Sequence, residues 1–269
     1  MQSPESREKI KEVIPITMLQ EFLSSKEAKN FLQEDNRIIG CIDGRVLPEG
    51  CLGLAGSGIL LPRDPETDLP KEQYMKILTE MVKKDELETL TWHRGHGGCG
   101  AAKIYLKSKG IEKPTDDQAT EAAQSFAERL GAELSRRAEK KVKVKEAEAP
   151  GGHNETGVYV DFTNKLDLMP ELDTERELPN GFMINPRLTN DFKYAVEEIK
   201  VAVSIAFGSH GKGSDAFTKE EPFFIMLVDY KGNPLPLNGL PKMIQGMIDS
   251  NFSQYKEKIK IQTANTLVA

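Results

Sequence analysis

The run Arg37-Ile38-Ile39-Gly40-Cys41-Ile42-Asp43-Gly44-Arg45 decides the fold that the sequence predicts. Its apolar beginning is typical of a short buried strand, and the Asp-Gly-Arg that follows indicates a loop. The segment Leu87 to His93 has a similar character, and a glycine-rich turn from Gly95 to Gly100 follows it. We therefore predict two buried strands, each of which ends in a loop with polar side chains.

Helices are predicted between and around these strands. Helical patterns cover residues 5–33, 71–84, 101–109 and a long segment that begins at Thr115. This long segment opens with Thr115-Asp-Asp-Gln118, which is typical of a capping box. Further strands are predicted within residues 50–61, 142–147 and 157–162. The alternation of strands and helices favours an α/β fold with a central, mostly parallel sheet flanked by helices.

The character of the chain changes after about residue 170. Residues 166–190 are rich in proline, aspartate and glutamate and predict an irregular excursion. Strands are then predicted at Lys200 to Phe207 and Phe223 to Asp229, and a helix at Pro241 to Tyr255. We expect a domain over residues 1–169 with an N-terminal helical arm, and an extra C-terminal α+β segment over residues 170–269 that packs on it. The sequence shows no convincing internal repeat.

The composition limits the classes of function. Hydrophobic residues make up 38% and charged residues 29% of the chain, and the net charge is -6. This balance is ordinary for a globular protein and, without a long basic run, argues against nucleic acid or an anionic membrane as partner. No apolar stretch approaches the length of a spanning helix, and Met1 to Val13 lacks the apolar core of a secretory signal. We expect a cytoplasmic protein whose three cysteines form no disulfide framework.

Metal-binding residue types occur in both predicted loops. Cys41 follows the first strand, and His96 and Cys99 follow the second. The carboxyl ends of parallel strands converge on one crevice, so these side chains are expected to meet. Two thiolates and an imidazole suit zinc, and three protein ligands leave a fourth position for water. Asp43 could orient a hydroxide on that zinc, and Arg45 beside it would keep the carboxylate ionised.

The two loops together resemble those of the β-class carbonic anhydrases. Cys-x-Asp-x-Arg over residues 41–45, followed by His-x-x-Cys-Gly over residues 96–100, is similar to the family's two motifs. The resemblance covers about residues 36–107, and residues 157–166 are similar to a later strand and turn. It implies a β-carbonic-anhydrase-like fold and the reversible hydration of carbon dioxide to bicarbonate. Zinc lowers the pKa of its bound water to about 7, and the resulting hydroxide attacks carbon dioxide.

The resemblance also implies roles for single residues. Cys41, His96 and Cys99 would be zinc ligands, and Asp43 with Arg45 would form a catalytic dyad. In some members of the family the aspartate itself binds zinc and closes the site, and Asp43 could be such a fourth ligand here if its pairing with Arg45 breaks. The family forms dimers in which an N-terminal helix embraces the partner subunit, so a homodimer or a higher homo-oligomer is implied, with residues 5–33 as the arm.

Departures from the family pattern keep alternatives open. Gly44 stands where the family usually has serine, Leu32 stands where it often has glutamine, and residues 170–269 have no counterpart. The alternatives to carbon dioxide hydration are hydrolysis of carbonyl sulfide or carbon disulfide, and a non-catalytic zinc-binding interaction module. The remaining cysteine and histidines are interpreted as structural or solvated residues: Cys51, His93, His153 and His210.

Overall fold

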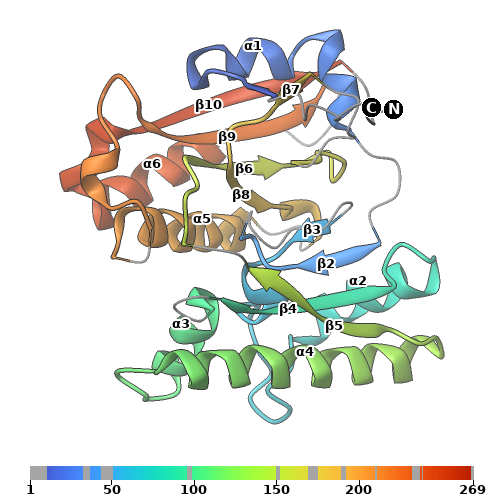
Figure 1. The fold of residues 1–269 in the computed structure, drawn as a ribbon. Helices are drawn as coiled ribbons and strands as arrows, with labels where there is room; N and C mark the ends of the chain where they lie inside the picture. Colours follow the sequence, from blue (N-terminus) through green and yellow to red (C-terminus); the bar gives the residue numbers. More distant parts are fainter. Residues whose placement is uncertain are drawn as a thin grey trace, which may run out of the picture.

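The fold is built on two four-stranded parallel sheets (Figure 1). The computed structural model describes residues 11–32, 37–43, 51–95, 99–149, 152–168, 175–188, 192–209, 211–231, 237 and 239–267. The first sheet has the order β3-β2-β4-β5. Its strands are β2 (Ile38–Gly40), β3 (Cys51–Gly53), β4 (Thr89–Gly95) and β5 (Lys143–Ala149), and all are parallel. We call the part from β2 to β5 the first half.

The second sheet repeats the strand order of the first. Its order is β8-β6-β9-β10, and its pairings are again parallel. The strands are β6 (Gly157–Asp161), β8 (Gly181–Ile184), β9 (Phe223–Tyr230) and β10 (Ile259–Thr266). We call the part from β6 to β10 the second half. In both halves the second strand in the chain lies at one edge, while the third and fourth lie on the other side of the first. The fold thus repeats one strand order, although the sequence shows no convincing internal repeat.

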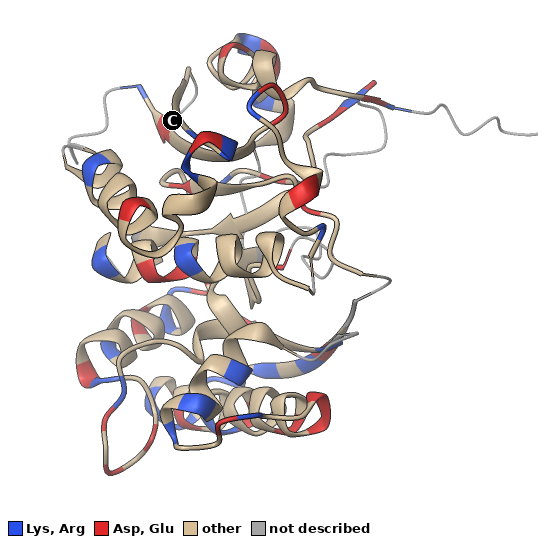
Figure 2. Cartoon of the chain, turned by 90° about the vertical axis from the view of Figure 1, so that its left-hand side faces the viewer, with Lys and Arg blue, Asp and Glu red and all other residues tan. Residues whose placement is uncertain are grey.

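The helices occupy matching connections in the two halves. The first half contains α2 (Glu72–Lys83), α3 (Gly100–Ser108) and α4 (Asp116–Ala138), and the second contains α5 (Phe192–Phe207) and α6 (Leu240–Asn251). Both α2 and α5 connect second and third strands, whereas α4 and α6 precede the fourth strands. The predicted capping box at Thr115 is present at the start of α4. Figure 2 shows that the helices carry both acidic and basic residues. Within the described ranges, no helix combines the length and the apolar character needed to cross a membrane.

The described part of the N-terminal arm is a chain of short pieces rather than one helix. They are β1 (Glu12–Val13), a 3-10 helix (Ile16–Met18), α1 (Leu19–Leu23) and a second 3-10 helix (Lys26–Phe31). Helix α1 ends at Leu23 with Ser24 as its C-cap, and Ser25 caps the following 3-10 helix, because its side chain accepts a hydrogen bond from Glu27 N. Apolar side chains of the arm, including Leu19 and Phe22, are buried against the second sheet. Strand β1 pairs with β7 (Arg176–Glu177).

The expected α/β class, with parallel sheets flanked by helices, is confirmed. The strand predicted at Lys200 to Phe207 is wrong, because these residues belong to α5. A helix that is apolar on most sides has a run that periodicity cannot distinguish from a buried strand. Strand β6 lies before the expected boundary at residue 169, yet it pairs with β8 and β9, which follow that boundary.

The two sheets meet at their edge strands β3 and β8. The Asn185 amide donates to the Gly53 carbonyl at 3.1 Å, and the Gly53 amide donates to Asn185 Oδ1 at 2.5 Å. The Met183 amide donates to the Ile42 carbonyl at 2.9 Å. The two halves are thus joined edge to edge by backbone hydrogen bonds, next to the loop that contains Cys41.

A buried carboxyl group reinforces this junction. Glu198 of α5 accepts a hydrogen bond from the Ala55 amide at 2.5 Å. Burial raises the pKa of Glu198 to about 8, although hydrogen bonds from Ala55 and Tyr194 oppose the shift. Because this pKa lies above the usual glutamate value of 4.5, the folded state holds the proton more tightly than the unfolded state. The contribution of Glu198 is fully present below pH 4.5 and is lost as the pH rises through about 8.

Between about pH 5 and pH 9, we therefore expect the free energy of unfolding to fall less in Glu198→Gln than in the wild type. The glutamine oxygen can still accept the Ala55 hydrogen bond, and its amide has no proton to lose. At about pH 9 the free energies of unfolding of variant and wild type should differ by about 5 kcal/mol, since the pKa of Glu198 is raised from 4.5 to about 8 and each pH unit between the two values corresponds to about 1.4 kcal/mol. Urea unfolding at several pH values measures it. The exposed neighbour Glu197 provides the control Glu197→Gln; equal pH dependence in all three proteins would contradict the prediction.

Candidate metal centre

Two cysteines predicted as metal ligands come together at the carboxyl ends of β2 and β4. Cys41 directly follows β2, which lies between β3 and β4, and Cys99 is the N-cap residue of α3. Both are buried, free thiols. The Gly56 amide donates to Cys41 Sγ at 3.3 Å. Gly56 has a φ of 54°, and a Cβ there would lie 2.5 Å from Ile59, so this close approach requires glycine.

The imidazole that lies with the two thiols is that of His93. One ligand atom from each of Cys41, His93 and Cys99 lies within 4.8 Å of the others, and all three residues are buried. From the sequence, His93 was interpreted as a structural residue and was not predicted to be a candidate ligand. His96, predicted as the third ligand, lies outside the described residues. His93 precedes His96 by three residues and lies near the end of β4. Both histidines are therefore candidates for the third ligand.

The thiols form a coupled pair. The Cys41 thiol donates a hydrogen bond to Cys99, and this bond together with burial raises the pKa of Cys41 well above its usual value. The same hydrogen bond lowers the pKa of Cys99, and the backbone amides of Ala102 and Ala101 at the start of α3 contribute to that shift. The helix start therefore favours a thiolate at Cys99, as its position in the sequence predicts. A metal ion would replace the proton that the two sulfur atoms share.

Asp43 lies beside this group and faces two histidines. Its Oδ2 atom is 4.0 Å from His93 Nε2 and 3.9 Å from His153 Nε2, and the carboxylate is buried. Arg45, its predicted partner, lies outside the described residues. In the described part of the chain, Asp43 thus connects the cysteine group to His153.

His153 is a second histidine whose place the sequence did not reveal. It lies in the connection before β6, and its Nδ1 is 3.1 Å from Oε2 of the buried Glu155. This contact orients the ring so that Nε2 faces Asp43. One ligand atom from each of Asp43, His153 and Glu155 lies within 4.8 Å of the others. The only signal in the sequence is the spacing of His153 and Glu155, which is too common to indicate a site.

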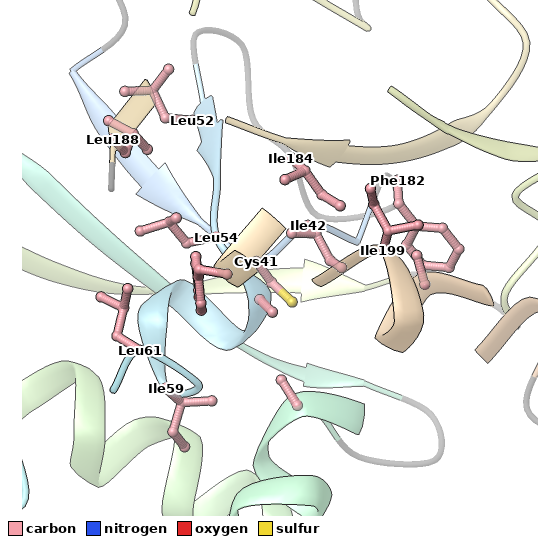
Figure 3. Close-up of a cluster of buried hydrophobic side chains, with 14 of the residues drawn as sticks. Cys41, Ile42, Leu52, Leu54, Ile59, Leu61, Phe182, Ile184, Leu188 and Ile199 are labelled. Atoms are coloured by element: carbon pink, nitrogen blue, oxygen red, sulfur yellow. The ribbon is translucent and has the colours of Figure 1, made fainter. Parts of the chain in front are cut away.

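A small cavity of about 10 Å³ lies between these polar groups and an apolar wall, and it has room for about one water-sized molecule. Figure 3 shows Cys41 within the surrounding cluster of buried apolar side chains. The wall comes from the second half and consists of Phe182, Val201 and Ile205. The second half thus contributes only apolar side chains to the cavity, and the polar groups come from the first half and from His153.

Comparison of the chain with protein-family models, curated proteins and solved structures gives no match. The chemistry of the site therefore rests on its own residues. Two buried thiols and an imidazole at these distances fit a borderline-soft metal ion.

Proposed function

We propose that the chain is a zinc-dependent enzyme that hydrates carbon dioxide reversibly to bicarbonate. The observation that supports this most is the buried group of two thiols and an imidazole beside a cavity for one small molecule. The order of the two loop motifs, similar to the β-class carbonic anhydrases, adds to it. Cytoplasmic location and the absence of a nucleic-acid or membrane partner remain part of the proposal.

The metal would be held by Cys41, Cys99 and one imidazole. The motif spacing assigns that imidazole to His96, and the geometry of the described residues offers His93. A zinc ion in this position supplies hydroxide at neutral pH. Three protein ligands leave it one position for exchange, as in catalytic rather than structural zinc sites.

Other side chains of the site would orient and exclude water. The Asp43 carboxylate is an acceptor that can fix the direction of a hydrogen bond from a water molecule in the cavity. His153 faces that carboxylate and is itself held by Glu155. The wall of Phe182, Val201 and Ile205 offers carbon dioxide, an apolar molecule, a surface that does not compete for it with hydrogen bonds.

Carbonyl sulfide and carbon disulfide are the alternative substrates, since the same apolar wall would accept them. Both are larger than carbon dioxide, and the small volume of the cavity favours the smaller molecule. Turnover with each of the three substrates separates these functions. Absence of turnover with all of them, in zinc-loaded protein, would favour the non-catalytic zinc-binding module.

We expect Asp43→Ala to retain zinc and to lose at least about 10²-fold in the rate of carbon dioxide hydration, a loss typical of a positioned proton-transfer group. Zinc should remain because the thiols and the imidazole are unchanged. Stopped-flow measurement with a pH indicator gives the rate, and elemental analysis gives the zinc content. The exposed Asp249 provides the matched control Asp249→Ala, which should leave both unchanged. A full rate in Asp43→Ala would contradict the role given to Asp43.

A further inference from the structure

We propose that the second half is a copy of the first that has lost its metal site and replaces, within the chain, the partner subunit of a symmetric dimer. One chain then binds one metal ion and is complete as a monomer. The proposal concerns assembly and metal content, and it holds whether or not carbon dioxide is the substrate.

The register of the two sheets gives a residue-by-residue correspondence. Ile39 pairs with Leu52 and Leu90, and Val160 pairs with Ile184 and Leu227. All six side chains belong to the same buried core as α2, α4, α5 and α6. Strand order and the face covered by helices agree with an alignment that also matches the last residues of β2 and β6, Gly40 and Asp161. It places Ile39, Leu52 and Leu90 at the positions of Val160, Ile184 and Leu227.

This alignment puts an aromatic ring at the metal position of the second half. Cys41 lies two residues after Ile39, and Phe162 lies two residues after Val160. Phe162 is buried and packs edge-on against Phe192, with ring centroids 5.7 Å apart. None of the three cysteines of the chain, at positions 41, 51 and 99, lies in the second half. The second half therefore lacks the thiols that form the metal centre of the first.

The loop at this position is also closed by its own hydrogen bonds. Asp161 accepts hydrogen bonds from the backbone and hydroxyl of Thr163, at 2.9 and 2.6 Å, and from the Leu166 amide at 3.0 Å. Its carboxylate is thus engaged in shaping the loop. Asn164 stands at the position that corresponds to Asp43, so the second half also lacks that carboxylate.

Corresponding residues contact each other where the halves meet. Gly53 follows Leu52 and Asn185 follows Ile184, so the alignment makes Gly53 and Asn185 equivalent. These two residues share two hydrogen bonds where β3 meets the end of β8, one from the Asn185 amide and one to the Asn185 side chain. Contact between equivalent residues is what an interface with two-fold symmetry produces near its axis. The junction has the arrangement of a dimer interface inside one chain.

The N-terminal arm lies on the second half of the same chain. Leu19, Phe22 and Phe31 are buried in one cluster with Tyr159 and Phe224 of the second sheet. The arm thus packs against its own chain, and its burial does not require a second copy of the chain. The homodimer implied by the family resemblance uses its arm on a partner subunit, and here the second half takes that position.

The second half also completes the metal centre of the first. Phe182, Val201 and Ile205 form the wall of the cavity opposite Asp43 and His93. Ile205 reaches the start of α3: a Cβ added at Gly100, next to Cys99, would lie 3.1 Å from its Cδ1 atom. A chain without the second half would leave this side of the metal centre open to water.

Cobalt titration and a mass measurement on the full chain test the proposal. Cobalt bound by thiolates has charge-transfer absorption, so its stoichiometry can be read without any assay of activity. We expect one cobalt ion per chain and a particle of about 30 kDa by light scattering at micromolar concentration. Two ions per chain, or a particle of twice that mass, would overturn the proposal.

A pair of variants tests the contribution of the second half to the metal centre. Ile205→Ala should release cobalt to a chelator at least about 10-fold faster than the wild type, because water gains access to the site. Ile261→Ala removes an equally half-buried isoleucine from β10 and should release cobalt at the wild-type rate. Equal release by both variants would show that the second half does not close the site, and would overturn that part of the proposal.

Discussion

Substitution Cys99→Ser is expected to abolish metal binding under ordinary conditions. A hydrogen bond from Cys41 and the amides at the start of α3 lower the pKa of Cys99 and favour a thiolate, although burial opposes this shift. A serine hydroxyl does not ionise at neutral pH and is a poor zinc ligand. The binding free energy of structural zinc with a complete set of protein ligands is about 10–16 kcal/mol, so the loss of one thiolate should weaken binding by at least about 10²-fold. Competition with a chromophoric chelator measures the affinity.

The third cysteine of the chain provides the matched control for this substitution. Cys51→Ala removes a thiol that belongs to neither metal-binding motif, and we expect it to bind zinc with wild-type affinity. Circular dichroism of both variants separates loss of the metal from loss of the fold. Wild-type affinity in Cys99→Ser would contradict the assignment of the metal centre.

The same competition assay decides between the two histidines. If His96 is the third ligand, as the motif predicts, His96→Ala should lose zinc. His93→Ala should then retain zinc, with His93 acting as a neighbour of Asp43. Loss of zinc in His93→Ala alone would assign the third position to His93, in agreement with the geometry of the described residues.

The sequence predicted those site residues that lie in local motifs. Cys41 and Cys99 each follow a strand in one parallel sheet, and the convergence of strand ends is sufficient to bring them together. His153 and the apolar wall lie in segments that reach the site through the pairing of the two halves. No local pattern indicates that pairing, because it is made by backbone hydrogen bonds between edge strands.

The repeated architecture could not be predicted from the sequence for a related reason. A buried parallel strand requires only a short apolar run, so Ile38 to Gly40 and Tyr159 to Asp161 can hold equivalent positions without similar residues. Helix α5 shows the same limit, since its run Val201 to Phe207 is apolar on nearly every side and was predicted as a strand. Strand β8 was hidden within a segment whose proline and acidic residues predicted irregular structure.

Substitution Gly53→Ala is expected to destabilise the whole chain through the junction of the two halves. A Cβ at this position would lie 1.9 Å from the Met183 carbonyl oxygen and 2.7 Å from its carbon. Both are backbone atoms of β8, so no side chain can rotate away and the two edge strands must separate. Separation would break the paired hydrogen bonds between Gly53 and Asn185. Overpacking and lost hydrogen bonds together should cost about 3 kcal/mol or more, or roughly 6–12 °C in Tm.

The chain contains a glycine for which the same substitution should have the opposite effect. Gly246 is exposed within α6, and a Cβ there would meet no atom within 4 Å. Gly246→Ala should therefore stabilise the protein by about 0.5–1 kcal/mol through helix propensity. Thermal unfolding of both variants measures the contrast. Because the Met183 amide also donates to Ile42, next to Cys41, Gly53→Ala should weaken cobalt binding as well, whereas Gly246→Ala should not. A Gly53→Ala protein with wild-type stability and cobalt affinity would mean that β3 and β8 do not join the halves, and that the metal centre is formed by the first half alone.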